Sequence, residues 1–371
     1  MVYHMTMFNK LHPVGPSNPK FRGYLTANKW TICLGAGVSR GIAPTWLDLA
    51  RQLINESFGA GFDGLTFADM VSESGWSLDA WIQIAANEFT LRGKSLDEFN
   101  ELLEAKLYSN IRDKARGLGL EKYLTRVLNF PKSAPKNRIL EVWDFIDTTF
   151  PDCSLLGLVR FLVDAAKVER GPQAVLTFNG DTFLETLIDL YLRREHYLGP
   201  GPHGHPTYYF VAMSHPGGTE GRKIPIFHCH GSIAPKYDMR HRPRDARDRL
   251  IFQEHEYLAA ASTNALWAET VFLFYAQSTK IAFVGMSMSD SNIRRWMSAL
   301  EREKKKSVYI LDKGKRINPE HIWITTKPND PIKQRISLVS QVHLGVRPAW
   351  IERWSELPAG LRNLAAVGEV V

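Results

Sequence analysis

Residues 30–41 read WTICLGAGVSRG, an apolar run of strand length that ends at a glycine turn. After Pro44, apolar residues recur at helical intervals, which predicts a strand, a tight turn and a helix that ends near Gly59. Glycines let a backbone approach a phosphate closely, and a helix N-terminus offers free N–H groups. Because Arg40 stands where the dinucleotide fingerprint needs its third glycine, this turn alone does not identify a nucleotide site.

The composition is that of a folded globular protein. The chain has 371 residues, 44% hydrophobic and 23% charged, which suits one large or two smaller domains. Its net charge of +7 permits contact with nucleic acid, but no long basic run requires it. The three cysteines are far apart and form no C-x-x-C pair, so we expect no structural zinc and a reduced, cytoplasmic protein. No segment has the length and apolarity of a signal core or a membrane span, so we expect no membrane partner.

Strand-like runs alternate with helical patterns along most of the chain. We expect an irregular arm over residues 1–28, a domain over 29–345 with a helical insertion at about 65–150, and a C-terminal helix within 346–371. This alternation predicts a Rossmann-like, doubly wound, mainly parallel sheet whose helical insertion follows the first strand. The further runs that we interpret as strands are 174–178, 224–232, 280–284, 307–311 and 336–342, with a short hairpin over 208–213.

Small or polar residues follow the predicted strands at their carboxyl ends. In open parallel sheets, ligands bind beyond these ends, so the residues should converge on one crevice. They are Gly35 and Gly37, Asn179 and Asp181, His228 and His230, Gly285, Ser287 and Asp290, and Asp312.

Four of these segments together resemble the sirtuin-like superfamily, and more closely its bacterial defence-associated NAD-hydrolase branch. They read GAGVS at 35–39, LTFNGD at 176–181, FHCHGS at 227–232 and VGMSMSD at 284–290, in the family's order. The resemblance spans roughly residues 30–312 and implies a NAD-binding domain. Two departures favour a NAD-consuming glycohydrolase over a protein deacylase: the four-cysteine zinc module is missing, and residues 43–46 read APTW where deacylases carry a Phe-Arg pair.

Cleaving the bond between ribose C1 and nicotinamide gives an oxocarbenium-like centre, as in glycoside hydrolysis. Asn179 has a donor and an acceptor, so it could hold a ribose hydroxyl and a water together. His230 could take a proton near neutral pH. Asp181 could cap the following helix, orient Asn179 or hold the nicotinamide amide, and Thr182 with Glu185 has capping-box spacing. We expect His228 to point to the opposite side of its strand and to serve packing.

The resemblance also implies roles in binding NAD+. We expect Gly35, Ala36, Gly37 and Ser39 to face the diphosphate, Ser287 to donate to a phosphate or ribose oxygen, and Asp312 to reach the adenosine ribose, with Gly285 and Asp290 nearby. No metal is expected, because spaced cysteines and His-x-x-x-His pairs are missing. The mixed charges of the arginine-rich residues 239–250 favour a solvated loop over a phosphate-binding patch.

The interpretation favoured by these observations is a NAD+ glycohydrolase that makes nicotinamide and ADP-ribose, with an implied role in antiphage defence by NAD+ depletion. One alternative is a NAD-dependent protein deacylase or ADP-ribosyltransferase. Another is a non-catalytic subunit that senses NAD or ADP-ribose or binds nucleic acid. We expect a homo-oligomer, and a separately encoded activator or ATPase partner is consistent with the sequence.

Overall fold

The computed structural model describes residues 12–25, 29–199, 209–213, 223–236, 250–259, 266–311 and 319–368. In this part of the chain, seven strands form one parallel sheet in the order β3-β4-β2-β1-β5-β6-β7. Helices flank the strands in the sequence, which confirms the predicted Rossmann-like α/β class. The strands are β1 (Trp30–Leu34), β2 (Val175–Thr177), β3 (Phe210–Met213), β4 (Ile224–His228), β5 (Lys280–Val284), β6 (His321–Thr326) and β7 (Val346–Ile351).

The chain divides into two compact units that interleave in the sequence. The first comprises residues 1–35, 160–176 and 269–371, and the second residues 36–159 and 177–268. The division falls inside β2 and inside two helices, α9 (Ser154–Lys167) and α12 (Leu266–Ser278). It also separates Gly35 from Ala36, so the glycine turn after β1 contributes residues to both units.

The first unit is built on buried strands with a close backbone contact at their ends. All five residues of β1 are buried, and Cys33 pairs in register with Phe283 of β5. The Gly35 N–H donates to the Val284 carbonyl at 3.0 Å, and a Cβ at Gly35 would lie 2.6 Å from Met286 Cγ. Only glycine fits this approach without displacing the segment after β5. The unit's remaining helices are α13 (Ser291–Leu311), α14 (Pro331–Ser340) and α15 (Leu357–Leu364).

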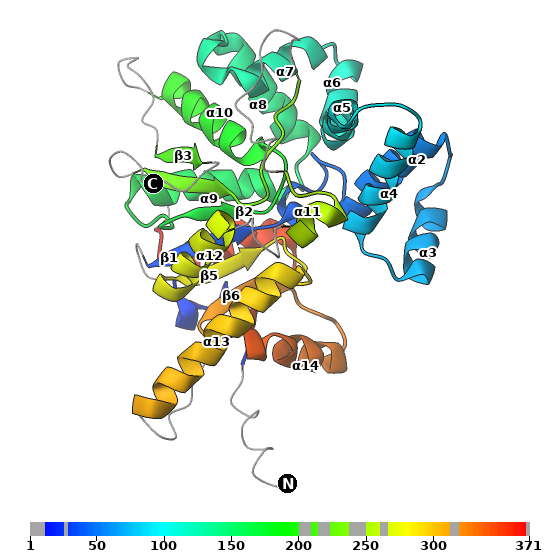
Figure 1. Cartoon of the computed structure of the whole chain (residues 1–371). Helices are drawn as coiled ribbons and strands as arrows, with labels where there is room; N and C mark the ends of the chain where they lie inside the picture. The colour runs from blue at the N-terminus through cyan, green and yellow to red at the C-terminus, as the bar shows by residue number, and fades with distance from the viewer. Residues whose placement is uncertain are drawn as a thin grey trace. The chain divides into compact units, whose positions relative to one another are not determined.

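The second unit holds the predicted helical insertion, which is confirmed as a succession of capped helices (Figure 1). Thr45, Asp63, Ser77 and Ser95 each accept a backbone N–H at a helix N-terminus, and Ser95 forms a capping box with Glu98. Figure 1 shows α7, α8 and α10 side by side, and their residues are in contact. The helices that lie wholly in the second unit are α2 (Trp46–Phe58), α3 (Gly64–Ser74), α4 (Leu78–Leu91), α5 (Leu96–Leu107), α6 (Ser109–Gly117), α7 (Glu121–Asn129), α8 (Lys136–Thr149), α10 (Phe183–Leu198) and α11 (Glu254–Ala259).

Several predicted strands are wrong, for identifiable reasons. Residues 307–311 end helix α13, because no breaker interrupts the lysine- and glutamate-rich sequence before them, and a short apolar run does not distinguish a strand from a helix. Residues 336–340 belong to α14, which Asp330 caps and Pro331 begins. Phe210–Met213 is a strand parallel to β4 and not part of a hairpin.

The C-terminal region also differs from the prediction. Val346–Ile351 is the edge strand β7, and Val14 pairs with Ala349 beside it. The terminal helix α15 starts at Leu357, within the predicted range 346–371. Strand β6 (His321–Thr326) was not predicted from the sequence. Among the described residues, no helix has both the length and the apolarity to cross a membrane.

Candidate functional site

A pocket in the second unit brings together the turn after β1 and the turn after β2. Ala36 and Ser39 belong to the first turn, and Asn179, Gly180 and Asp181 to the second. The pocket has an empty volume of about 330 Å³, part of which is open solvent. Its other lining residues are Ala43, Pro44, Trp46, Leu49, Leu107 and Phe252. The site thus combines a few buried polar groups with an apolar, partly aromatic wall.

Asn179 lines this pocket and has one side-chain oxygen that accepts no hydrogen bond from any described residue. Its backbone N–H donates to Thr177 Oγ1 at 3.2 Å, and its side-chain Nδ2 donates to Ser39 Oγ at 3.5 Å. Its Oδ1 is buried and has no hydrogen-bond partner among the described residues. Leaving a buried acceptor unpaired costs about 1–3 kcal/mol, so this oxygen is suited to accept a hydrogen bond from a ligand hydroxyl or a water.

Asp181 lies beside Asn179 and caps the turn. Its Oδ1 accepts the Phe183 N–H at 3.0 Å. Burial and the negative charge of Glu185 raise the pKa of Asp181, whereas the Phe183 N–H, His228 and the Ser39 hydroxyl lower it, and the net result is a pKa of about 6. Asp181 is therefore a carboxylate that changes charge near pH 6, at the edge of the pocket.

The predicted capping box at Thr182 and Glu185 is wrong. Thr182 makes no side-chain cap hydrogen bond, and its Oγ1 lies 3.1 Å from the hydroxyl of Tyr108. Glu185 instead points to His228, with 3.1 Å between Glu185 Oε1 and His228 Nε2. The Glu185 carboxylate thus contacts the buried imidazole of His228 and does not cap the N-terminus of α10.

The two histidines do not simply alternate along a strand. Strand β4 ends at His228, and the Gly231 N–H donates to the His228 carbonyl, which closes a turn. His228, which we expected to serve packing, is buried, and its ring lies beside Glu185 and interacts with Asp181 and the Asn179 backbone. His230 is also buried, and its ring meets Phe178 edge-on with 4.8 Å between centroids. The described lining of the pocket includes Asn179 but not His230.

Backbone hydrogen bonds nevertheless hold the two predicted catalytic segments next to each other. The Cys229 N–H donates to the Thr177 carbonyl at 2.9 Å, and the Ile233 N–H donates to the Gly180 carbonyl at 2.7 Å. The residues between these bonds include Asn179 on one segment and His230 on the other. The structure thus places the turn after β2 alongside the loop after β4.

The aromatic wall depends on Gly180. A Cβ at Gly180 would lie 2.1 Å from Phe252 Cζ, so the Phe252 ring covers the turn closely. Trp46 lies beside this ring with 5.3 Å between centroids. Glu256 Oε2 accepts the backbone N–H of both Phe252 and Gln253, at 2.6 and 2.7 Å. Helix α2 and the segment 250–256 thus supply the aromatic side of the pocket.

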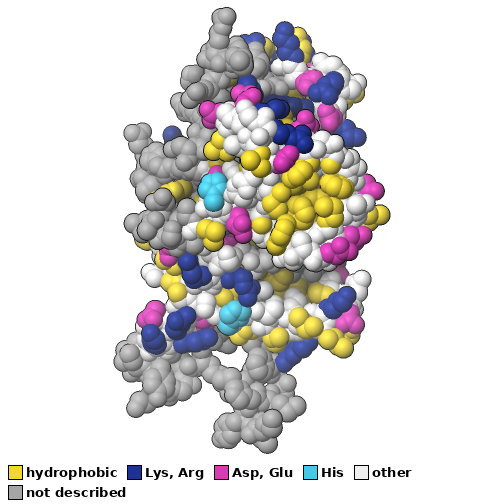
Figure 2. Space-filling model, turned by 45° about the vertical axis from the view of Figure 1, so that its right-hand side comes forward, with side chains coloured by type: hydrophobic (Ala, Val, Ile, Leu, Met, Phe, Trp, Pro, Cys, Tyr) yellow, Lys and Arg dark blue, Asp and Glu magenta, His cyan; other side chains and the backbone are white. Residues whose placement is uncertain are grey.

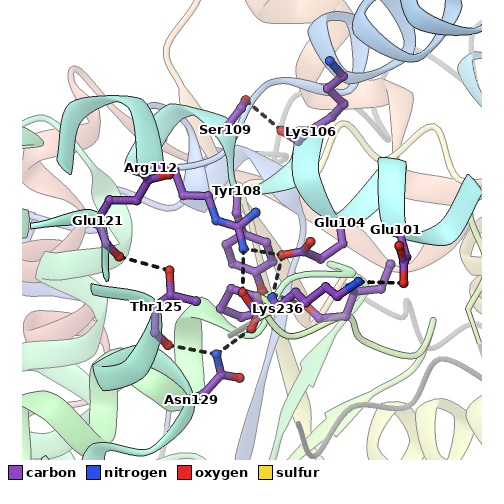
Figure 3. A network of polar contacts seen from close by, with 12 residues as sticks. Glu101, Glu104, Lys106, Tyr108, Ser109, Arg112, Glu121, Thr125, Asn129 and Lys236 are labelled. Carbon is purple, nitrogen blue, oxygen red and sulfur yellow. Dashed lines mark hydrogen bonds and ion pairs between the residues drawn. The ribbon is translucent and has the colours of Figure 1, made fainter. Parts of the chain in front are cut away.

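A network of polar contacts ties the helical insertion to the loop that follows His230 (Figure 3). Tyr108, at the end of α5, donates to the Ile233 carbonyl at 2.7 Å and accepts the Thr182 N–H at 2.9 Å. Glu104 Oε1 accepts from Arg112 at 2.6 Å and from the Lys236 backbone N–H at 2.7 Å. Figure 3 shows these side chains pointing toward one another from α5, α6 and the 233–236 loop. The insertion therefore fixes both the start of α10 and the loop after β4.

The other predicted binding residues have local roles in the described structure. Gly285 adopts a φ of +67° and follows β5 in the first unit. Ser287 Oγ lies 2.5 Å from Ser289 Oγ, and Asp290 accepts the Ile293 N–H at the start of α13. Gly37 belongs to the turn after β1, as predicted. Asp312 and residues 239–249 of the arginine-rich loop lie outside the described residues.

Several site residues were not predicted from the sequence. Trp46 was assigned only to a helix face, and Tyr108, Glu185 and Phe252 received no role in the pocket. No local pattern marks them, because their roles arise from contacts between segments more than 40 residues apart. Within the described ranges, no group of three or more His, Cys, Asp or Glu side chains could hold a metal ion.

Comparison with known families agrees with the fold and the motifs. Residues 173–339 match the family model of the SIR2-like domain, which supports the resemblance to the sirtuin-like superfamily. The matched region contains Asn179, Asp181 and both histidines of β4 and its loop. The match supports a function related to NAD. No curated protein matches the chain.

Proposed function

We propose that the protein is a NAD+ glycohydrolase whose reaction takes place at the pocket formed by Ser39, Asn179 and Asp181. The observation that carries the proposal is the buried, unpartnered Oδ1 of Asn179 in a pocket with an aromatic wall. An acceptor held in this way suits a ribose hydroxyl, and aromatic side chains suit the flat nicotinamide ring.

In the proposed reaction, the bond between ribose C1 and the nicotinamide nitrogen breaks, and the bonding electrons leave with nicotinamide. Water attacks C1 and loses one proton, which gives ADP-ribose. Asn179 orients the ribose hydroxyl and the water, and His230 accepts the proton directly or through the hydroxyl. His230 lies on the segment that backbone hydrogen bonds hold beside the turn carrying Asn179.

The experiment is to incubate the purified protein with NAD+ and to identify the products by mass. We expect nicotinamide and ADP-ribose in equal amounts, and we expect EDTA to leave cleavage unchanged. Acyl-ADP-ribose formed only with an acylated peptide would favour the deacylase alternative. Tight NAD+ binding without any product would instead favour a sensor that does not cleave NAD+.

We further propose that cleavage serves antiphage defence by depleting NAD+. The support is the resemblance of the four motifs to the defence-associated branch, together with the missing cysteine module. The test compares cellular NAD+ during phage infection in bacteria that express the wild type or the Asn179→Ala variant. We expect NAD+ to fall only with the wild type; equal NAD+ in both strains would contradict this role.

A further inference from the structure

A buried histidine lies against a glutamate carboxylate beside the turn that carries Asn179. His228 Nε2 and Glu185 Oε1 are 3.1 Å apart, and the side chains of His228 and Glu185 are 4% and 22% exposed. The second carboxylate oxygen of Glu185 is buried and makes no hydrogen bond to any residue described. This pair joins the end of β4 to the first turn of α10, and neither residue lines the pocket with Asn179.

The groups around His228 place it between two carboxylates. Glu185 approaches from α10, Asp181 from the turn after β2, and the Asn179 backbone from the same turn. The buried phenol of Tyr108 approaches both carboxylates from the end of α5. Burial alone would lower the pKa of His228, but Glu185, Asp181 and the Asn179 backbone outweigh it, and the pKa is raised above 6.5. A protonated His228 therefore balances negative charge that would otherwise be buried without a partner.

We propose that His228, anchored in its protonated form by Glu185, is a positioning residue that holds the Asn179–Asp181 turn in its catalytic geometry. This inference rests on the proposed glycohydrolase activity. Loss of the proton leaves Glu185 and Asp181 as two neighbouring buried carboxylates, which repel each other and displace the turn. A displacement of about 1 Å at a catalytic group can cost on the order of 100-fold in rate.

The test uses Glu185→Gln, which keeps the shape of the side chain and removes its charge. Without the carboxylate, the pKa of His228 falls, so the alkaline limb of the kcat profile moves to lower pH. We expect kcat at pH 8 to fall about 10-fold or more and KM for NAD+ to change little. The matched control is Asp189→Asn on the same helix, which removes one charge that pairs with Arg193 and not with His228.

A second measurement avoids reliance on turnover. NMR titration of the His228 ring should give a pKa above 6.5 in the wild type and a lower value in Glu185→Gln. An unchanged alkaline limb in a folded Glu185→Gln protein would overturn the inference, as would an ordinary His228 pKa in the wild type. The same loss in Asp189→Asn would also overturn it. If the wild type does not cleave NAD+ at all, the proposed function fails and this inference fails with it.

Discussion

At the scale of single residues, burial determines the hydrogen bonding and the pKa values of the polar groups in the pocket. Ser39, Asn179 and Asp181 are all at least nine-tenths buried, and they contact one another. Ser39, which the motif suggested for the diphosphate, accepts a hydrogen bond from Asn179 and interacts with Asp181. The glycine turn after β1 therefore supports the turn after β2 directly, and Asn179 keeps one free acceptor for a ligand.

The raised pKa of Asp181 predicts an acidic limit to turnover. Because the folded pKa is about 6, the carboxylate is ionised above this pH and becomes neutral below it. We expect kcat to fall as the pH drops through 6. The separate fall in kcat that follows deprotonation of His228 should occur at a pH above 6.5. The check is a pH profile of NAD+ cleavage for the wild type and for Asp181→Asn. An acidic limb that persists unchanged in a folded Asp181→Asn protein would show that another group titrates.

Gly180 should be intolerant of a side chain. In Gly180→Ala, the new methyl group would meet the Phe252 ring at 2.1 Å, so the ring must move. Such overpacking costs about 1–3 kcal/mol of unfolding free energy. Combining it with Phe252→Ala should remove the clash, so the double variant should lose less than the sum of the two single variants. Denaturant unfolding of all three variants measures this, and strict additivity would contradict the contact.

At the scale of elements, the strands and turns nearest the site were predictable, whereas the segments that contact them were not. β1 and β5 match their predicted bounds, because each is an apolar run closed by glycine. The end of α13 was predicted as a strand, because Ser307–Leu311 is apolar and only the preceding helix shows its true state. The partners Tyr108, Glu185 and Phe252 depend on tertiary contacts, which single-sequence patterns do not contain.

The contact of α5 and α6 with the loop after β4 depends on Glu104. This carboxylate is buried and accepts from Arg112 and from the Lys236 N–H, so Glu104→Ala leaves both donors without it. Breaking a buried ion pair in this way costs about 3–5 kcal/mol. The control is Glu101→Ala, whose exposed pair with Lys236 should be worth less than about 1 kcal/mol. Equal unfolding midpoints for the two variants would contradict the assigned role.

At the scale of the whole molecule, the surface offers apolar area for association. Figure 2 shows a group of hydrophobic side chains exposed on one face, where basic and acidic side chains are otherwise mixed. In the helical insertion, Leu65, Trp76 and Leu91 are each more than half exposed. Exposed apolar groups of this kind favour contact with another protein surface, which is consistent with the proposed oligomer.

We therefore expect assembly to control turnover. A NAD+ hydrolase that is always active would exhaust its own cell, so the dilute chain should turn over slowly and become faster as it associates. The measurement is specific activity against protein concentration, with the oligomeric state determined by light scattering at each point. In a variant with Leu65→Ser and Leu91→Ser, the rise in specific activity should occur at a higher protein concentration than in the wild type. Full activity of a clean monomer at all concentrations would contradict the expectation.

The most direct test of the central claim measures both product formation and NAD+ binding for Asn179→Ala and His230→Ala. We predict that both variants lose cleavage, His230→Ala by roughly 10²–10⁴-fold. NAD+ affinity should fall far less, because most of the dinucleotide lies away from these groups, and the two losses should be non-additive. His343→Ala, an exposed histidine of the first unit, serves as the control and should cleave like the wild type. Near-normal cleavage by a folded Asn179→Ala protein would contradict the account.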